Sequence, residues 1–192
     1  MWVRSAAIRP VPGHAVLTRQ ALELAEGRLG DDADAETRLD ALFEELSEKQ
    51  PVLGARLAAA FSRDRDELAS ALGYYLSLIV FKSFDEAFGA LLESVDEVSL
   101  RSVEEALTLD EELRGADPKE AVDSDDVIAM EQPHVLAFLH EHIDTALELH
   151  AESADVDAVH RTYRMLLVEI LALSYAVAVP TDLRLNSHEA QA

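Results

Sequence analysis

The 192-residue chain contains no cysteine, which excludes disulfide bridges, thiolate metal ligands and cysteine nucleophiles. It also lacks a long uninterrupted apolar run. The longest run, Met165 to Val179, contains Glu169 and is too short to span a bilayer. The first residues lack the continuous apolar core of a signal peptide. We therefore expect a cytoplasmic protein with no membrane-spanning segment.

Positive charge is scarce. The chain has 16 basic against 38 acidic residues, a net charge of −22, and only three of the basic residues are lysines. Such a surface repels phosphates, which argues against nucleic acid and anionic membranes as partners. Three interpretations remain: adaptation of the surface to high salt, a docking surface for a basic protein partner, and mimicry of a nucleic acid backbone. Dependence on molar salt for folding would single out the first.

No glycine-rich phosphate loop, nucleophile elbow or Ser/His/Asp constellation is present. The sequence therefore favours a non-enzymatic protein that needs no cofactor. Its function would be to interact with a protein partner, for which charge favours a basic one, or with a second copy of itself.

Apolar residues recur at helical spacing along most of the chain, and no segment alternates as a strand would. We predict an all-α, single-domain bundle of about six to eight helices, spanning residues 15–180. Two long apolar helices, over 64–92 and 156–179, form its centre. Residues 1–14 form an extended arm, residues 110–126 an acidic connector, and residues 181–192 a polar tail.

The dipeptide Gln-Pro occurs twice, at Gln50-Pro51 and Gln132-Pro133, each time at the predicted start of a helix. Proline suits the first helical position, where its missing N–H costs nothing. The pattern predicts two imperfectly related helical hairpins, each ending in one of the long central helices. Few other positions agree between the copies.

Each predicted central helix carries one charge within its apolar run, Lys82 in the first and Glu169 in the second. An unpaired charge in a core costs several kcal/mol, so each needs a partner or a route to solvent. Two hypotheses follow: the two side chains pair with each other, or each reaches past its neighbours to water.

A metal-dependent enzyme, using carboxylates and histidines in the bundle, is the first alternative function. Glu131-x-x-His134 matches one element of a carboxylate di-iron site, and the predicted turn brings His150, His160 and Glu152 together. Glu45-x-x-Glu48 and Glu93-x-x-Asp96 resemble the Mg²⁺-binding pairs of all-α nucleotide pyrophosphohydrolases, although their separation departs from that motif. The competing interpretation is that these are surface side chains in an acidic protein.

A sensor for a small apolar ligand is the second alternative. Tyr74, Tyr75 and Phe81 would line a cavity between helices. The same aromatic residues at helical spacing are also typical of an ordinary core.

Overall fold

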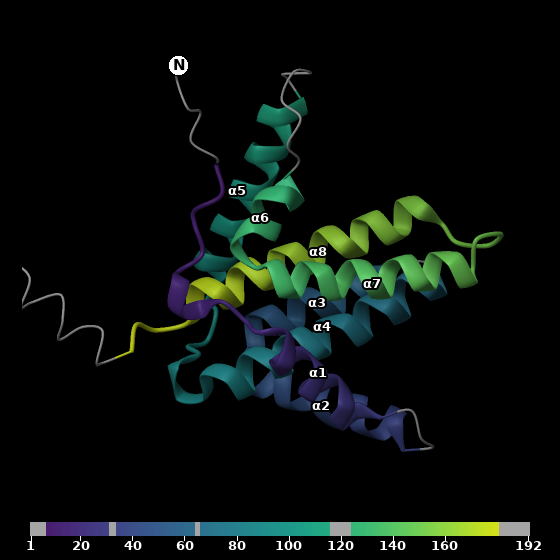
Figure 1. Cartoon of the computed structure of the whole chain (residues 1–192), viewed down its shortest axis with the longest axis horizontal. Helices are drawn as coiled ribbons and strands as arrows, with labels where there is room; N and C mark the ends of the chain where they lie inside the picture. Colours follow the sequence, from purple (N-terminus) through teal and green to yellow (C-terminus); the bar gives the residue numbers. More distant parts are fainter. Residues whose placement is uncertain (1–6, 31–33, 64–65, 116–123, 181–192) are drawn as a thin grey trace, which may run out of the picture.

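The computed structural model describes residues 7–30, 34–63, 66–115 and 124–180 (Figure 1). Within these ranges the chain forms eight α-helices and no named strand, which confirms the predicted all-α bundle. Two short 3-10 turns, η1 (Gly13–Ala15) and η2 (Gly89–Leu91), accompany them. The helices are α1 (Arg19–Leu29), α2 (Ala35–Lys49), α3 (Pro51–Arg63), α4 (Glu67–Phe88), α5 (Glu97–Gly115), α6 (Ser124–Glu131), α7 (Pro133–Leu149) and α8 (Val156–Ala176).

The two long helices begin and end at residues that differ from the prediction. Asp66 caps α4, accepting a hydrogen bond from the backbone N–H of Ala69 at 2.7 Å, so the helix starts after residue 64. The second helix, α8, stops at Ala176 rather than residue 179. Val177 instead forms an isolated antiparallel bridge with Leu92, and an extended backbone cannot continue a helix.

The predicted acidic connector over 110–126 is wrong at both of its ends. Residues 110–115 continue α5, and α6 begins at Ser124. Residues 116–123 lie outside the described part of the chain, as do residues 1–6 of the predicted arm and the whole predicted tail over 181–192. Asp110, assigned to the connector by its acidity, is buried and accepts a hydrogen bond from the N–H of Ala7.

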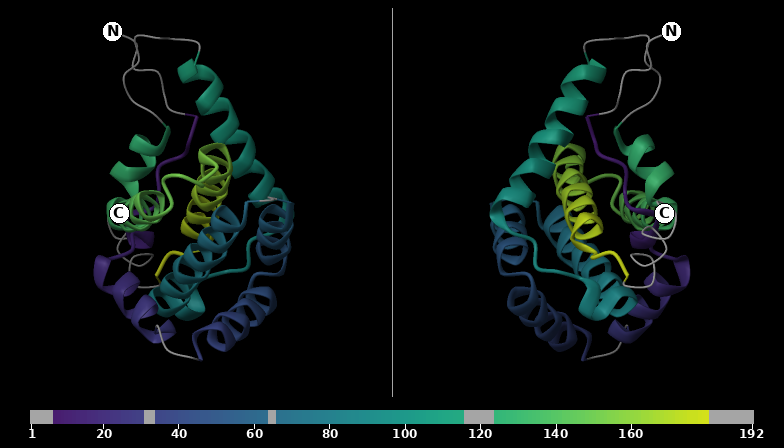
Figure 2. Two further views of the ribbon diagram at one scale, coloured as in Figure 1. Left: turned by 90° about the vertical axis from the view of Figure 1, so that its right-hand side faces the viewer. Right: turned by 90° about the vertical axis from the view of Figure 1, so that its left-hand side faces the viewer.

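Helices α4 and α8 form the centre and run in the same direction (Figures 1 and 2). Near their starts the Thr162 hydroxyl donates to the carbonyl of Ala69, and after their ends Leu92 pairs with Val177. The approach is close at Gly73, where an added Cβ would lie 2.6 Å from both Phe61 and Thr162. Helices α5 and α6 lie at one end of the molecule, and α1 and α2 at the other.

The two Gln-Pro dipeptides form matching corners, between α2 and α3 and between α6 and α7. Gln50 and Gln132 share the backbone angles φ −131° and ψ 62°. Each backbone N–H still bonds to the carbonyl four residues earlier, at 2.8 Å and 2.7 Å. The helices that follow have 13 and 17 residues, closer in length than the sequence indicates. The relationship between the two halves is therefore stronger in structure than in sequence.

Both corner glutamines are buried, and each side chain binds an extended segment far away in the sequence. The Gln50 amide accepts from the N–H of Val95 at 2.8 Å and donates to the carbonyl of Glu93 at 3.0 Å. The Gln132 amide accepts from the N–H of Leu17 at 3.0 Å and donates to the carbonyl of Ala15 at 2.8 Å. One amide thus satisfies a donor and an acceptor two residues apart, as a neighbouring β-strand would.

None of the helices in the described part of the chain combines the length and the apolarity that crossing a bilayer requires.

Candidate functional site

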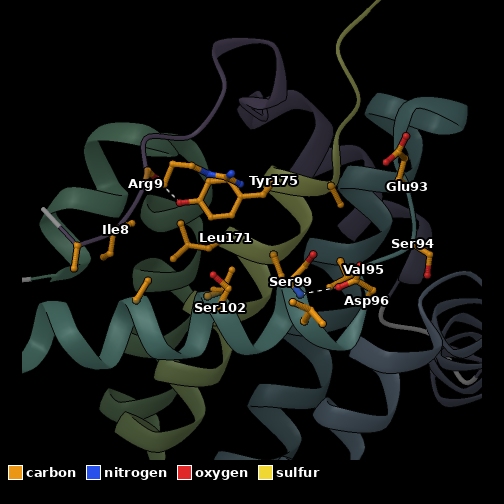
Figure 3. A pocket seen from close by; sticks show the side chains of 16 residues that line it. Ile8, Arg9, Glu93, Ser94, Val95, Asp96, Ser99, Ser102, Leu171 and Tyr175 are labelled. Carbon is orange, nitrogen blue, oxygen red and sulfur yellow. Dashed lines mark hydrogen bonds between the residues drawn. The ribbon is translucent and has the colours of Figure 1, made fainter.

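A hollow of about 550 Å³ lies beside α5 and α8 (Figure 3). Three parts of the chain surround it: residues 7–9, the extended segment 93–96 with the first turns of α5, and the last turns of α8. We call this hollow the α5–α8 groove. It is lined by Ala7, Ile8, Arg9, Glu93, Ser94, Val95, Asp96, Val98, Ser99, Ser102, Val103, Ala106, Leu171, Ala172, Tyr175 and Ala176.

The extended segment that forms one wall of the groove is held along both of its edges. On one side the Gln50 amide binds Glu93 and Val95, as described above. On the other side the N–H of Glu93 donates to the carbonyl of Ala176 at 2.9 Å. Buried Val95 anchors the segment, while the side chains of Glu93 and Asp96 on either side of it are exposed. The groove therefore carries two carboxylates on a fixed backbone.

Asp96 begins α5. Its carboxylate accepts a hydrogen bond from the backbone N–H of Ser99 at 2.7 Å. Hydrogen bonds from Ser99 hold the pKa of Asp96 below its ordinary value. The carboxylate is therefore ionised throughout the neutral range, and it contributes negative charge to the groove.

The opposite end of the groove contains Tyr175 and Arg9 (Figure 3). The Arg9 guanidinium lies over the tyrosine ring, 4.1 Å from its centroid, and the tyrosine hydroxyl donates to the Arg9 carbonyl. Burial raises the pKa of the Tyr175 hydroxyl, so the hydroxyl stays protonated and remains a donor. Among the described residues that line the groove, Arg9 carries the only basic side chain.

The three aromatic residues of the predicted ligand cavity point to different places. Phe81 is fully buried in the core. The Tyr74 ring packs on Phe43 with ring centroids 5.5 Å apart, and burial, with nearby Asp40, raises the pKa of its hydroxyl to about 12. Tyr75 lines a shallow apolar pocket of about 350 Å³ between α4 and α7.

The predicted metal ligands do not form a site. No group of three or more histidine, aspartate or glutamate side chains suited to a metal ion occurs in the described chain. His134, His150, His160 and Glu152 are all exposed. Glu131 precedes Gln132 and accepts a hydrogen bond from the N–H of Val11 at 3.0 Å, so it holds the N-terminal arm instead.

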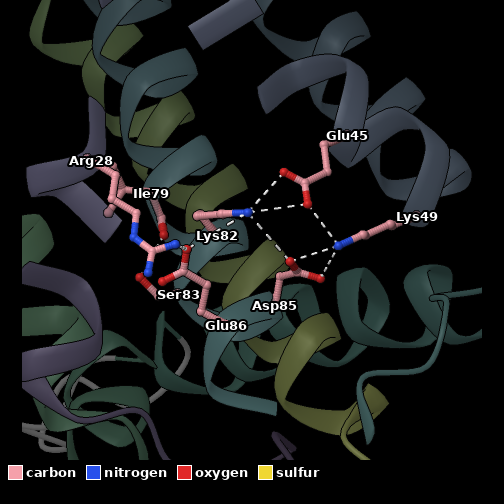
Figure 4. Close-up of polar contacts among 8 residues, drawn as sticks. All are labelled: Arg28, Glu45, Lys49, Ile79, Lys82, Ser83, Asp85 and Glu86. Atoms are coloured by element: carbon pink, nitrogen blue, oxygen red, sulfur yellow. Dashed lines mark hydrogen bonds and ion pairs between the residues drawn. The ribbon is translucent and has the colours of Figure 1, made fainter. Parts of the chain in front are cut away.

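The hypothesis that Lys82 and Glu169 pair with each other is wrong. The Lys82 ammonium lies 3.0 Å from Glu45, on α2, and 3.7 Å from Asp85, and its side chain is 20% exposed (Figure 4). Glu45 also pairs with Lys49, at 2.8 Å. This network joins α2 to α4 and partly reaches solvent, which is the second of the two hypotheses for Lys82.

Glu169 fits neither hypothesis, because it neither pairs with Lys82 nor reaches solvent. Its side chain is fully buried on α8, and neither carboxylate oxygen has a hydrogen-bond partner in the described chain. Burial raises the pKa of this carboxyl well above its ordinary value. A charged carboxylate without partners is very costly in a core, so the group is held as a neutral acid.

Lys82→Met is expected to lower the free energy of unfolding by about 1 kcal/mol at low ionic strength, because three carboxylates lose a partly exposed cation. Urea unfolding in low and in molar salt measures the loss, which should shrink as salt screens the network. In a double variant with Glu169→Gln the two effects should add. Strong coupling between them would mean that the two side chains do interact.

Sequence reasoning identified Glu93 and Asp96 only as a possible Mg²⁺ pair, and it missed Tyr175 and Arg9. Nothing in a single acidic chain distinguishes two carboxylates at a groove from the remaining ones. Glu93 and Asp96 share one feature, which is that both lie at the boundary of a helix. Asp96 is the N-cap of α5, and Glu93 follows the end of a helix.

Comparison of the chain with protein-family models, with curated proteins and with solved structures finds no match. The candidate site therefore stands on its own geometry.

Proposed function

We propose that the protein is a non-enzymatic interaction protein that binds a basic, extended segment of a protein partner in the α5–α8 groove. The observation that carries the proposal is the charge of the groove: exposed Glu93 and Asp96 line it, and the one basic side chain at its wall is stacked on Tyr175. The net charge of −22 adds a long-range field that attracts positive partners.

The shape of the groove supports an extended ligand. Its floor consists of small and apolar side chains, among them Ala172, Ala176 and Ala106, which leave room for a backbone. Val98 is 78% exposed at its edge and offers an apolar contact to alternate side chains of a bound strand. An arginine-bearing segment would meet carboxylates and apolar surface together, which suits the long arginine side chain.

The proposal predicts that a short fluorescein-labelled peptide alternating arginine with leucine binds the protein, whereas its glutamate counterpart does not. Glu93→Gln combined with Asp96→Asn should weaken binding about tenfold, since each of the two exposed ion pairs that are lost contributes up to about 1 kcal/mol. Fluorescence anisotropy at physiological salt measures both affinities. Asparagine still caps α5, so the variant retains the helix start.

The control must separate the groove from the general field of an acidic protein. Glu148→Gln combined with Glu152→Gln removes the same two charges from exposed positions at the α7–α8 turn. This control should change the affinity less than twofold, since screening limits the reach of exposed charges. Equal losses in the two double variants would show that the peptide responds only to net charge, and would contradict the proposal.

The small-ligand alternative rests on the pocket between α4 and α7. It is apolar, with Leu72, Ala146 and Leu149 in its lining, but it is shallow. At one side, Glu26 accepts hydrogen bonds from Tyr75 at 3.2 Å and His142 at 2.8 Å. These bonds tie α1 to α4 and α7, and the polar groups are used by the fold itself.

A further inference from the structure

The N-terminal part of the chain closes the Tyr175 end of the α5–α8 groove. Ala7, Ile8 and Arg9 contribute to the lining, and the side chains of Ile8 and Val11 are buried. Residues 7–12 are not helical, and they contain two prolines, which favour an extended backbone. We call residues 7–11 the arm. It includes the basic side chain of Arg9 and no acidic residue.

Side chains of three helices hold the arm. The N–H of Ala7 donates to buried Asp110 on α5 at 3.2 Å, and the N–H of Val11 donates to Glu131 at the end of α6 at 3.0 Å. From α8, Tyr175 donates to the Arg9 carbonyl and stacks its ring against the guanidinium. Within the described chain, no backbone–backbone hydrogen bond fixes residues 7–11.

The root of the arm is fixed separately. Gln132 binds Ala15 and Leu17, and the ring of His14 lies 3.2 Å from the carbonyl of Val177. The N–H of Ala15 also bonds to the carbonyl of Pro12 at 2.8 Å. Residues 7–11 can therefore leave the groove while residues 13–17 stay attached to the core.

The arm resembles the proposed ligand in chemical character, although it binds other carboxylates than Glu93 and Asp96. An extended segment carries a basic side chain, its backbone N–H groups reach carboxylates, and its apolar side chains reach the interior. A bound partner segment that continued past the Tyr175 end of the groove would need the space that Ile8 and Arg9 fill.

We propose that residues 7–11 are a built-in competitor at the Tyr175 end of the α5–α8 groove: a basic partner segment extends past this end only when these residues leave. The inference rests on the proposed function and names how that site is regulated. It gives the arm two states, docked and released, and the partner selects the released one. The apparent affinity for the partner is then the intrinsic affinity reduced by the fraction of molecules with a released arm.

The test uses the full chain and the same arginine–leucine peptide. Ile8→Ser combined with Val11→Ser weakens docking of the arm and leaves its root unchanged. If the arm is docked in about nine of ten molecules, this variant binds the peptide about tenfold more tightly than the unmodified protein. Val156→Ser, an exposed position at the start of α8, is the matched control and should leave the affinity unchanged.

Two further measurements keep the inference falsifiable if the double variant folds poorly. Glu131→Gln is nearly isosteric and weakens one bond of the arm, so it should raise the affinity in the same direction by a smaller factor. Hydrogen exchange at the amides of Ala7 and Val11 should speed up when the unmodified protein is saturated with peptide.

The possible outcomes separate the two proposals. If neither the unmodified protein nor the variants with a weakened arm bind the peptide, the proposed function fails. If all of them bind equally and exchange at Ala7 and Val11 is unchanged, the arm is no competitor, and the proposed function stands.

Discussion

Gln132→Ala is expected to lower the free energy of unfolding by about 3 kcal/mol or more, because each buried polar group left without a partner costs about 1–3 kcal/mol. The substitution strands the N–H of Leu17 and the carbonyl of Ala15, and it removes a bond of 2.9 Å to the hydroxyl of Ser174. It also leaves a cavity at a fully buried position. Urea unfolding followed by circular dichroism measures the loss.

The structural equivalence of the two corners gives this prediction an internal comparison. Gln50→Ala strands the N–H of Val95 and the carbonyl of Glu93, but the bond to exposed Glu93 is only partly buried, so the loss should be smaller than for Gln132→Ala. Gln20→Ala, at an exposed position on α1, should change stability by less than about 0.5 kcal/mol. If Gln132→Ala changes the free energy of unfolding as little as Gln20→Ala does, water replaces the hydrogen bonds of the amide. The corner would then not depend on Gln132.

The corner glutamines also mark the limit of what the sequence predicts. Proline at the first helical position predicts the starts of α3 and α7. Apolar spacing predicts α3, α4, α7 and α8 with small errors in their bounds. The partners of Gln132 lie 115 and 117 residues away in the chain. Helical periodicity carries no information about which extended segment folds back against a corner, so the role of the glutamine becomes visible only in the structure.

The same limit explains why the sequence left the partner of Lys82 open. The spacing of apolar residues correctly places Lys82 on a central helix. A single sequence does not show which other helix packs beside Lys82. The partner is Glu45 of α2, one of many carboxylates in the chain. The candidate groove was missed for a related reason: the Gln50 corner, the end of α8 and the arm create it together, and none of them carries a motif.

Glu169→Met is expected to raise the free energy of unfolding by about 1–3 kcal/mol near pH 5, the range for relieving a buried polar group without partners. Both carboxylate oxygens lack hydrogen bonds in the described chain, and the side chain is fully buried. Methionine is similar in length and adapts its shape, so it should fill the space with little strain. Most core substitutions destabilise, which makes a gain here diagnostic.

The pH dependence of this gain has a definite sign. Burial raises the pKa of Glu169 in the folded state well above its ordinary value of 4.5. Between those two values the folded protein holds a proton that the unfolded chain has released, so the contribution of this group to stability falls as pH rises. Below pH 4.5 both states are protonated and the pH-dependent part vanishes. The advantage of Glu169→Met over the unmodified protein should therefore grow from pH 5 to pH 8.

Glu169→Gln separates charge from polarity. Its amide stays neutral at every pH, so it should abolish the same pH dependence, yet it still places unmatched polar atoms in the core and should gain less than methionine. Parallel urea unfolding curves of the three proteins across this pH range test both statements. If Glu169→Met and Glu169→Gln both lose stability by similar amounts at all pH values, the carboxyl makes a favourable contact in solution and is no unpaired acid. Such a result would restore the idea of a partner for this side chain, although not Lys82, which Glu45 already holds.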